Sequence, residues 1–140
     1  MNEIQEELAR LMKLGGGILR PVEVVKAAKP KKSPLHDCFE WDDEKAGHEY
    51  RLNQARHLIV SVVVVASGGE MLQAHISLKP DRYSPGGGYR AMVDVLSDKE
   101  LRAQMLAEAL AELEVFRRKY KDLKELAGIF AAMKKARKPA

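Results

Sequence analysis

The sequence predicts an α+β fold with a helix-turn-helix-like N-terminal segment, a three-stranded antiparallel sheet and a long C-terminal helix. Three observations support this fold class. Apolar residues recur at helical spacing up to about residue 58, a period of two with many β-branched residues follows, and a proline-free helical composition begins at 97. A chain of 140 residues suits one compact domain. The expected parts of that domain are an N-terminal helical region over 1–58, a sheet over 59–96 and a long helix with a basic tail over 97–140.

The N-terminal region should hold four helices. Asn2 and Gln5 can form a capping box for the first helix, and Pro21 fits the first turn of the second. A Ser-Pro pair at 33–34 repeats the start signal for a third helix of one or two turns. Asp42 is expected to cap the fourth helix, which should run to about residue 57.

The middle of the chain should form the sheet. β-branched residues dominate Ile59 to Val65, a Ser-Gly-Gly turn follows, and apolar and polar residues alternate from Met71 to Leu78, which predicts a hairpin. On its second strand, His75 should face solvent together with its polar neighbours. Residues 79–88 contain two prolines and three consecutive glycines, so we expect a mobile loop there before a third strand from Tyr89 to Val95.

The last third of the chain should be one long helix, with a bend or break near Gly128 as the alternative. Ser97 and Glu100 match a capping box, and an apolar heptad stripe continues for more than three heptads. A helix of this length is longer than a small domain is wide, so part of the stripe should pair with a second copy as a coiled coil in a homodimer. The expected oligomerisation residues are Leu106, Leu113, Phe116, Tyr120, Leu123 and Phe130.

The composition excludes several classes of protein. Cys38 is the only cysteine, so no intramolecular disulfide can form, and we expect its side chain in the core. The longest apolar run, Leu58 to Ala66, is about half of the roughly 20 residues that a membrane helix requires, and we expect no signal peptide. A cytoplasmic protein is therefore expected. The His, Cys and Asp side chains at 36–48 lack the spacing of a metal site, and Cys38 lacks the cationic neighbour that an activated nucleophile needs. Neither glycine triplet has the sequence context of a phosphate loop, so the sequence predicts neither an enzyme nor a cofactor.

Basic side chains give the strongest functional signal. The net charge is +4 at pH 7, and lysine and arginine cluster near the second helix and at the C-terminus, where several phosphate contacts would together give salt-sensitive affinity. Ordinary solvated lysines are the alternative. The fourth helix carries side chains suited to base edges. The expected nucleic-acid-binding residues are Arg20, Lys26, Lys29, Lys31, Lys32, Lys45, Arg51, Asn53, Gln54, Arg56, Lys134, Lys135, Arg137 and Lys138.

The most distinctive stretch is SPLHDCFEWDDEKAGHEYRLNQARHLI at 33–59. Its elements are Ser-Pro-Leu-His at 33–36, Phe-x-Trp-Asp-Asp at 39–43 and Tyr-Arg-x2-Gln-Ala-Arg at 50–56. With these elements the stretch resembles a motif of small phage- and prophage-encoded proteins of unassigned function, although Gly47 stands where that motif has alanine. The resemblance implies a viral or mobile-element setting, in which small basic proteins regulate or package DNA or inhibit a host complex.

Two functions follow from these observations. The first is a non-enzymatic, DNA-associated phage-type protein, regulatory or architectural, that contacts double-stranded DNA through its basic clusters and N-terminal helices and self-associates through its C-terminal helix. The alternative is a phage-encoded inhibitor or adaptor of a host complex, whose motif helix and Trp41 form the surface that contacts a host protein. Affinity for duplex DNA that falls steeply with salt would favour the first function.

Overall fold

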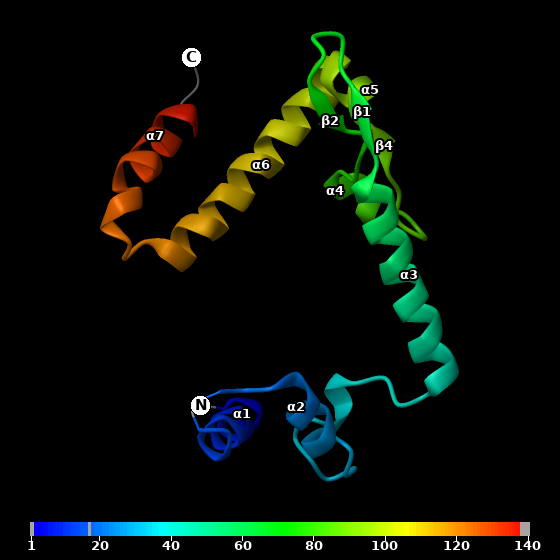
Figure 1. Cartoon of the computed structure of the whole chain (residues 1–140), viewed down its shortest axis with the longest axis vertical. Helices are drawn as coiled ribbons and strands as arrows, with labels where there is room; N and C mark the ends of the chain where they lie inside the picture. The colour runs from blue at the N-terminus through cyan, green and yellow to red at the C-terminus, as the bar shows by residue number, and fades with distance from the viewer. Residues whose placement is uncertain (1, 17, 138–140) are drawn as a thin grey trace. The chain divides into compact units, whose positions relative to one another are not determined.

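The computed structural model describes residues 2–16 and 18–137 (Figure 1). The chain is mostly helical with two small antiparallel sheets, and it divides into two compact units, residues 1–54 and residues 55–140. The α+β class is therefore confirmed in its broad form. Among the described residues, no helix combines the length and the apolar character that are needed to cross a bilayer.

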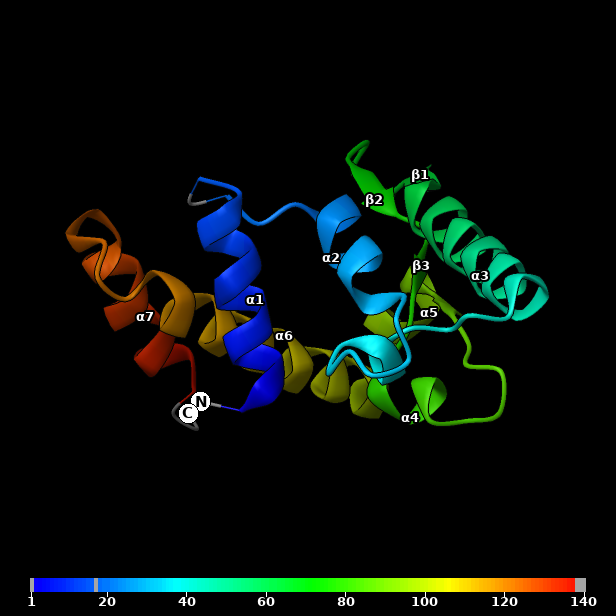
Figure 2. The ribbon, with the colours of Figure 1, turned by 90° about the horizontal axis from the view of Figure 1, so that it is seen from below.

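The first unit contains α1 (Glu3–Leu14), α2 (Pro21–Ala28), the 3-10 turn η1 (His36–Cys38) and the first part of α3 (Asp43–Ser61). Figure 2 shows α1 and α2 in shades of blue, and Arg20 leads into α2 with an extended backbone. The Asn2 side chain accepts a hydrogen bond from the Gln5 N–H, and the Gln5 side chain accepts one from the Asn2 N–H, each at 2.9 Å. The capping box predicted for the first helix is confirmed.

The predicted three-stranded sheet is wrong, because the strands form two separate two-stranded ladders. β1 (Val63–Val65) pairs antiparallel with β2 (Met71–Gln73), and the Ser-Gly-Gly turn between them makes the predicted hairpin. β3 (His75–Ile76) pairs instead with β4 (Arg90–Ala91). The second predicted strand is thus divided at Ala74 between two partners, and most of the third predicted strand is helical.

α3 extends into residues that were expected to begin the first strand, since it ends only at Ser61. The last carbonyls of a helix have no partner within it. Here the Nδ1 of His75 lies 3.0 Å from the carbonyl oxygen of Ile59, which can only accept, so Nδ1 carries the proton. His75 is therefore partly buried and supports the end of α3, and the prediction that it simply faces solvent is wrong.

The segment predicted as a loop over 79–88 begins with a short helix, α4 (Lys79–Arg82). Glu108 of α6 (Lys99–Tyr120) accepts hydrogen bonds from the Lys79 N–H at 2.9 Å, from Arg82 Nη2 at 2.8 Å and from Gln104 Nε2 at 2.9 Å. Burial raises the pKa of Glu108, but these hydrogen bonds outweigh it and the net pKa is lowered. The anionic form of Glu108 therefore ties α4 to α6.

α5 (Met92–Ser97) packs against α6, and it contributes Val95 to the core of the second unit. Val95 is fully buried and Leu78 is 2% exposed. The predicted capping box at Ser97 is wrong, because Ser97 ends α5 and its hydroxyl donates to the carbonyls of that helix. Asp98 caps α6 instead by accepting the Leu101 N–H at 2.9 Å.

The single long C-terminal helix is also wrong. α6 ends at Tyr120, and after the turn η2 (Lys124–Leu126) the chain turns back in α7 (Ala127–Arg137), as Figure 1 shows in orange and red. No proline or glycine lies between 121 and 126, so the turn comes from tertiary packing. It buries Phe130 and Met133, and the Phe130 ring meets the Phe116 ring edge-on with centroids 6.4 Å apart.

The helical hairpin of α6 and α7 divides the predicted oligomerisation stripe. Phe116 stacks at a tilt on Tyr120, with centroids 4.7 Å apart, and contacts Phe130 of α7, so these three rings pack within one copy. Leu106, Leu113 and Leu123 stay exposed. The predicted stripe therefore does not form a continuous apolar seam along a single helix.

Candidate nucleic-acid interface

The basic residues predicted near the second helix all lie in the first unit and are exposed. Arg20 precedes α2, Lys26 lies in its last turn, and Lys29, Lys31 and Lys32 belong to the turn that follows. The Nη1 of Arg20 donates to the carbonyl of Gly15 at 3.3 Å, which holds that side chain over the end of α1. These cations can reach a ligand, but carboxylates lie among them.

Glutamates share the surface hollows with two of these cations. Lys32 lines a hollow of about 460 Å³ together with Glu3, Glu6, Glu7 and Arg10 of α1, and Glu7 is already paired with Arg10. Arg20 lines another together with Glu23. Over residues 2–54 the sequence has nine lysines and arginines against ten aspartates and glutamates, so the first unit as a whole is not basic. Lys26, Lys29 and Lys31 line neither of these hollows.

The distinctive motif builds the connection between α2 and α3. The Nδ1 of His36 donates to the carbonyl of Ala28, the last residue of α2, at 2.9 Å. The indole Nε1 of Trp41 donates to the His36 carbonyl at 2.8 Å, and the two rings stack with centroids 5.1 Å apart. Leu35 is 2% exposed at the base of this joint. The motif residues His36 and Trp41 therefore have a structural role.

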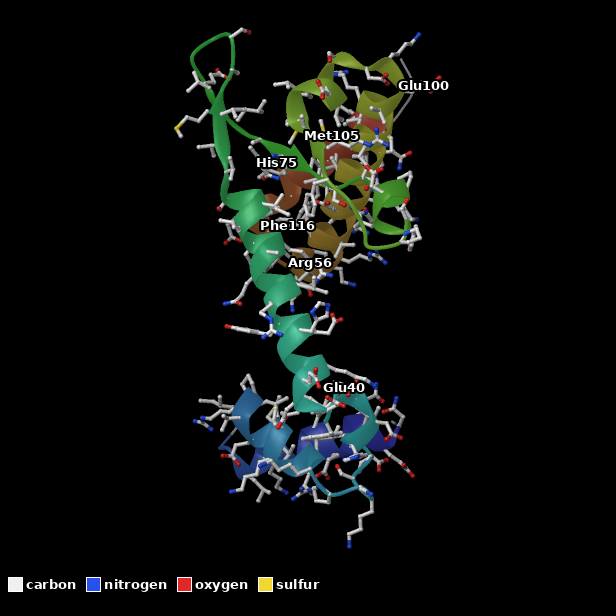
Figure 3. All side chains as sticks on the ribbon, turned by 90° about the vertical axis from the view of Figure 1, so that its right-hand side faces the viewer. Glu40, Arg56, His75, Glu100, Met105 and Phe116 are labelled. Atoms are coloured by element: carbon white, nitrogen blue, oxygen red, sulfur yellow. The ribbon has the colours of Figure 1, made fainter. Side chains whose placement is uncertain are left out.

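The start of α3 is anionic. Asp42 caps the helix as predicted, because its Oδ1 accepts the N–H groups of Glu44 and Lys45 at 3.0 and 3.1 Å. A hollow of about 520 Å³ at this end is lined by acidic and mixed polar side chains, with Glu40 labelled in Figure 3; its residues are Glu40, Asp42, Glu44, Lys45, His48 and Glu49. Phosphates would be repelled from this end of the helix.

The predicted reading residues on α3 are all exposed, namely Lys45, Arg51, Asn53, Gln54 and Arg56. A helix-turn-helix joins its helices by a turn of about three or four residues and places the N-terminal residues of the second helix at base edges. Here residues 29–42 separate α2 from α3, and the second helix begins with carboxylates. The tight helix-turn-helix geometry is not formed by α2 and α3.

The C-terminal cluster lies on α7. Lys134 and Lys135 are exposed, whereas Arg137 turns back onto α6, where its Nη2 lies 3.2 Å from Glu114 Oε2 and donates to the Leu110 carbonyl at 3.1 Å. The remaining predicted residue of this cluster, Lys138, lies outside the described residues. Arg137 therefore stabilises the hairpin, and Lys134 and Lys135 are the cations left for a ligand.

Glu114 is the anion that organises this end of the hairpin. Its carboxylate accepts three hydrogen bonds from Arg117, the shortest at 2.6 Å from Nη2. The hydrogen bonding with Arg117, against a smaller opposing effect of burial, lowers the pKa of Glu114 to about 2. Glu114 thus stays ionised and pairs with Arg117 and Arg137 within the hairpin.

Sequence reasoning missed the basic residues at the turn of the hairpin. Residues 117–137 carry eight lysines and arginines against two carboxylates, and over residues 55–140 the balance is fifteen against ten. The run RRKYKDLK at 117–124 was the available signal, but it had been assigned to a long dimeric helix. The exposed cations of the hairpin are Arg118, Lys119, Lys121, Lys124, Lys134 and Lys135, here called the hairpin cations.

Metal-ligating side chains and the single cysteine were the other candidates for chemistry in the part of the chain that the structure describes. No group of three or more His, Cys, Asp or Glu side chains is placed to hold a metal ion within residues 2–16 and 18–137. Cys38 is exposed, so the prediction that it lies in the core is wrong; it sits at the end of η1, and the core position nearby is taken by Leu35.

Comparison with known proteins gives no family assignment. No protein-family model matches the chain, and no curated protein and no solved structure matches it significantly.

Proposed function

We propose that the chain is a non-enzymatic, self-associating, DNA-associated protein of phage type that acts in the bacterial cytoplasm, in a regulatory or architectural role. The hairpin cations are its main contact with the phosphate backbone. Lys26, Lys29 and Lys31 of the first unit supply a second, weaker contact.

The concentration of uncompensated charge on the hairpin carries this proposal. The six hairpin cations are exposed, and between residues 118 and 135 the sequence has only two carboxylates, Asp122 and Glu125. Arg118 also interacts with the Glu114 carboxylate, so the other five cations carry most of this charge. α7 has 11 residues and so extends about 16 Å, a length over which duplex DNA presents several phosphates. Binding of this kind neutralises phosphates without reading bases.

The anionic start of α3 favours sequence-independent binding. The residues suited to base edges follow Asp42, Asp43 and Glu44, which would be brought to the groove first if α3 entered it by its N-terminus. Electrostatic anchoring by the hairpin needs no such approach. The proposal therefore assigns α3 no base contact.

A salt series of duplex binding, measured by fluorescence anisotropy on the full chain, tests the proposal. If six phosphates are contacted, the affinity should fall about 10³-fold between 50 and 200 mM salt. Replacing Lys134 and Lys135 by glutamine should weaken binding and make the salt dependence shallower by about two phosphate contacts.

The matched control is the double replacement of Lys99 and Arg102 by glutamine. These residues are exposed cations at the other end of α6, so the net charge changes equally. Their loss should leave the salt dependence unchanged. Equal weakening by both double variants, or binding that does not depend on salt, would contradict the hairpin as the contact.

A second candidate is a protein-binding adaptor of a host complex, and the acidic hollow at the start of α3 favours it. Glu40, Asp42, Glu44 and Glu49 form an anionic surface that fits a basic partner segment. A lysine-rich peptide would then shift the amide resonances of residues 40–49 and leave those of α7 unchanged. Absent duplex binding together with this result would replace the first proposal by the second.

A further inference from the structure

β1 has a second edge that is free of strand pairing in the described part of the chain. The hairpin sheet contains only β1 and β2, so among residues 2–16 and 18–137 no strand pairs with the second edge of β1. Natural edge strands are shielded from further pairing by charged side chains, proline, bulges or a covering element. Residues 58–69 contain neither a charged residue nor a proline, so neither of these two protections is present at β1.

The register shows which backbone groups point outward. The Ala66 N–H donates to the Glu70 carbonyl, and the Ala74 N–H donates to the Val62 carbonyl, so 62 and 66 belong to hydrogen-bonded pairs. Hydrogen-bonded and non-hydrogen-bonded pairs alternate along an antiparallel ladder. Val64 therefore bonds with Leu72, whereas the N–H and carbonyl groups of Val63 and Val65 point to the open edge.

The side chains around this edge are apolar and exposed. Val63, Val64 and Val65 are 49%, 39% and 73% exposed, and Met71 on β2 is 71% exposed. In Figure 3 the side chains of the green hairpin project from the ribbon on both sides. Leu58, in the last turn of α3 in the same unit, is also apolar and 68% exposed.

From this geometry we infer that two copies of the chain associate through antiparallel pairing of β1 with β1, which gives a continuous four-stranded sheet. Such an interface is isologous, so each copy offers the same donors and acceptors. With Val64 on the two-fold axis, Val63 of each copy faces Val65 of the other, and these two pairs make four hydrogen bonds. A two-fold axis at any other residue would leave some outward N–H and carbonyl groups of the three-residue strand unpaired. Residues 58–69 carry no charged side chain, so no like charges would be brought together across the axis.

This inference specifies the surface for the self-association included in the proposed function, and it replaces the interrupted heptad seam. Its test contains no nucleic acid. A failure of the edge pairing would therefore leave the binding of DNA by the hairpin cations untouched, and the reverse also holds.

A pair of substitutions at Val65 tests the outward hydrogen bonds. Val65→Pro removes the outward N–H and leaves the bonds between β1 and β2 intact, since proline is tolerated on the solvent side of an edge strand. Val65→Thr keeps the N–H and the β-branched shape. Sedimentation of the full chain over a concentration series should show a monomer–dimer equilibrium whose dissociation constant rises roughly tenfold or more in Val65→Pro, because each dimer loses two bonds. It should change less than about threefold in Val65→Thr.

Cross-linking locates the two-fold axis, with Cys38→Ser as the background. Only a residue on the axis faces its own copy, so Val64→Cys should form an intermolecular disulfide, because the two Cα atoms of a non-hydrogen-bonded pair lie about 4.5 Å apart. Val62→Cys is the matched control. Its two copies would lie about 14 Å apart along the strand, which is too far for a disulfide.

Amide hydrogen exchange completes the test without any substitution. The Val64 amide should be protected at every concentration, and the amides of Val63 and Val65 should become protected only as the dimer forms. A monomer at all concentrations would overturn the inference. A dimer that survives Val65→Pro and fails to cross-link at Val64 would also overturn the inference, because the contact would then lie elsewhere. The inference would equally fail if the amides of Val63 and Val65 became protected only when a different protein was added.

Discussion

Glu108 is the carboxylate that ties α4 to α6, and Glu108→Ala should destabilise the second unit by about 2 kcal/mol. The Lys79 N–H at the start of α4 loses its acceptor, which costs about 1 kcal/mol. The ion pair with Arg82 contributes only about 0.5 kcal/mol, because the Arg82 side chain is half exposed. The bond from Gln104 contributes about as much again. The better helix propensity of alanine returns a few tenths.

Urea unfolding followed by far-UV circular dichroism measures this loss as a lower midpoint at unchanged slope. Glu112→Ala is the matched control, because Glu112 is an exposed glutamate on the same helix and gains the same helix propensity. Its effect should stay within about 0.5 kcal/mol. Glu108→Gln keeps an acceptor oxygen and should fall between the two. Equal effects of Glu108→Ala and Glu112→Ala would refute the role assigned to Glu108.

Three further results are expected. The pKa of Glu114 is lowered from 4.5 to about 2, first by its hydrogen bonding with Arg117. The stabilisation from this group is therefore complete above pH 4.5 and is lost as the pH falls toward 2. An acid titration followed by circular dichroism should show this loss of stability, and Glu114→Gln should remove the part of the pH dependence that Glu114 causes. Phe130→Ala should cost about 3 kcal/mol in urea unfolding, and a loss below about 1 kcal/mol would contradict the packing of α7 on α6. Asp42→Ala should cost about 1 kcal/mol by removing the cap of α3, whereas Asp43→Ala, one residue later, should cost less than half of that in the same assay.

The sequence predicted those features whose cause lies within a few residues. The Asn2 capping box, the Asp42 cap and the Ser-Gly-Gly turn of the hairpin all depend on hydrogen bonds between residues at most a few positions apart. Such bonds follow from local residue types, so a single sequence is sufficient to find them. Their positions therefore matched the structure closely.

The features that were mispredicted depend on contacts between distant residues. α3 replaces the start of a predicted strand where His75, sixteen positions later, bonds to Ile59. The long helix breaks after Tyr120 because Phe130 and Met133 are buried only when α7 turns back. Periodicity and composition describe each segment alone, and they do not contain these pairings.

Sequence reasoning found only part of the candidate interface, because the rest also depends on how distant segments pack together. Lys134 and Lys135 were identified by their clustering, and the structure leaves both exposed. Lys119 and Lys121 were missed because an uninterrupted helix would have placed them on the flank of a dimer seam. The turn at 121–126 instead puts them on the same hairpin as the cations of α7. Grouping these cations from the sequence would require knowing where α6 ends.

The two proposals together predict a coupling that neither predicts alone. A dimer joined through β1 carries two basic hairpins on one particle, so the second hairpin meets a bound duplex at a high effective concentration. Val65→Pro should then lower the affinity for a duplex of about 40 base pairs by roughly tenfold or more. It should leave the affinity for a duplex of about 10 base pairs nearly unchanged, because that length, about 34 Å, accommodates one hairpin. An equal loss on both lengths would mean that Val65 acts on the fold or touches DNA itself. No loss on either would show that one hairpin suffices, which separates DNA binding from dimer formation.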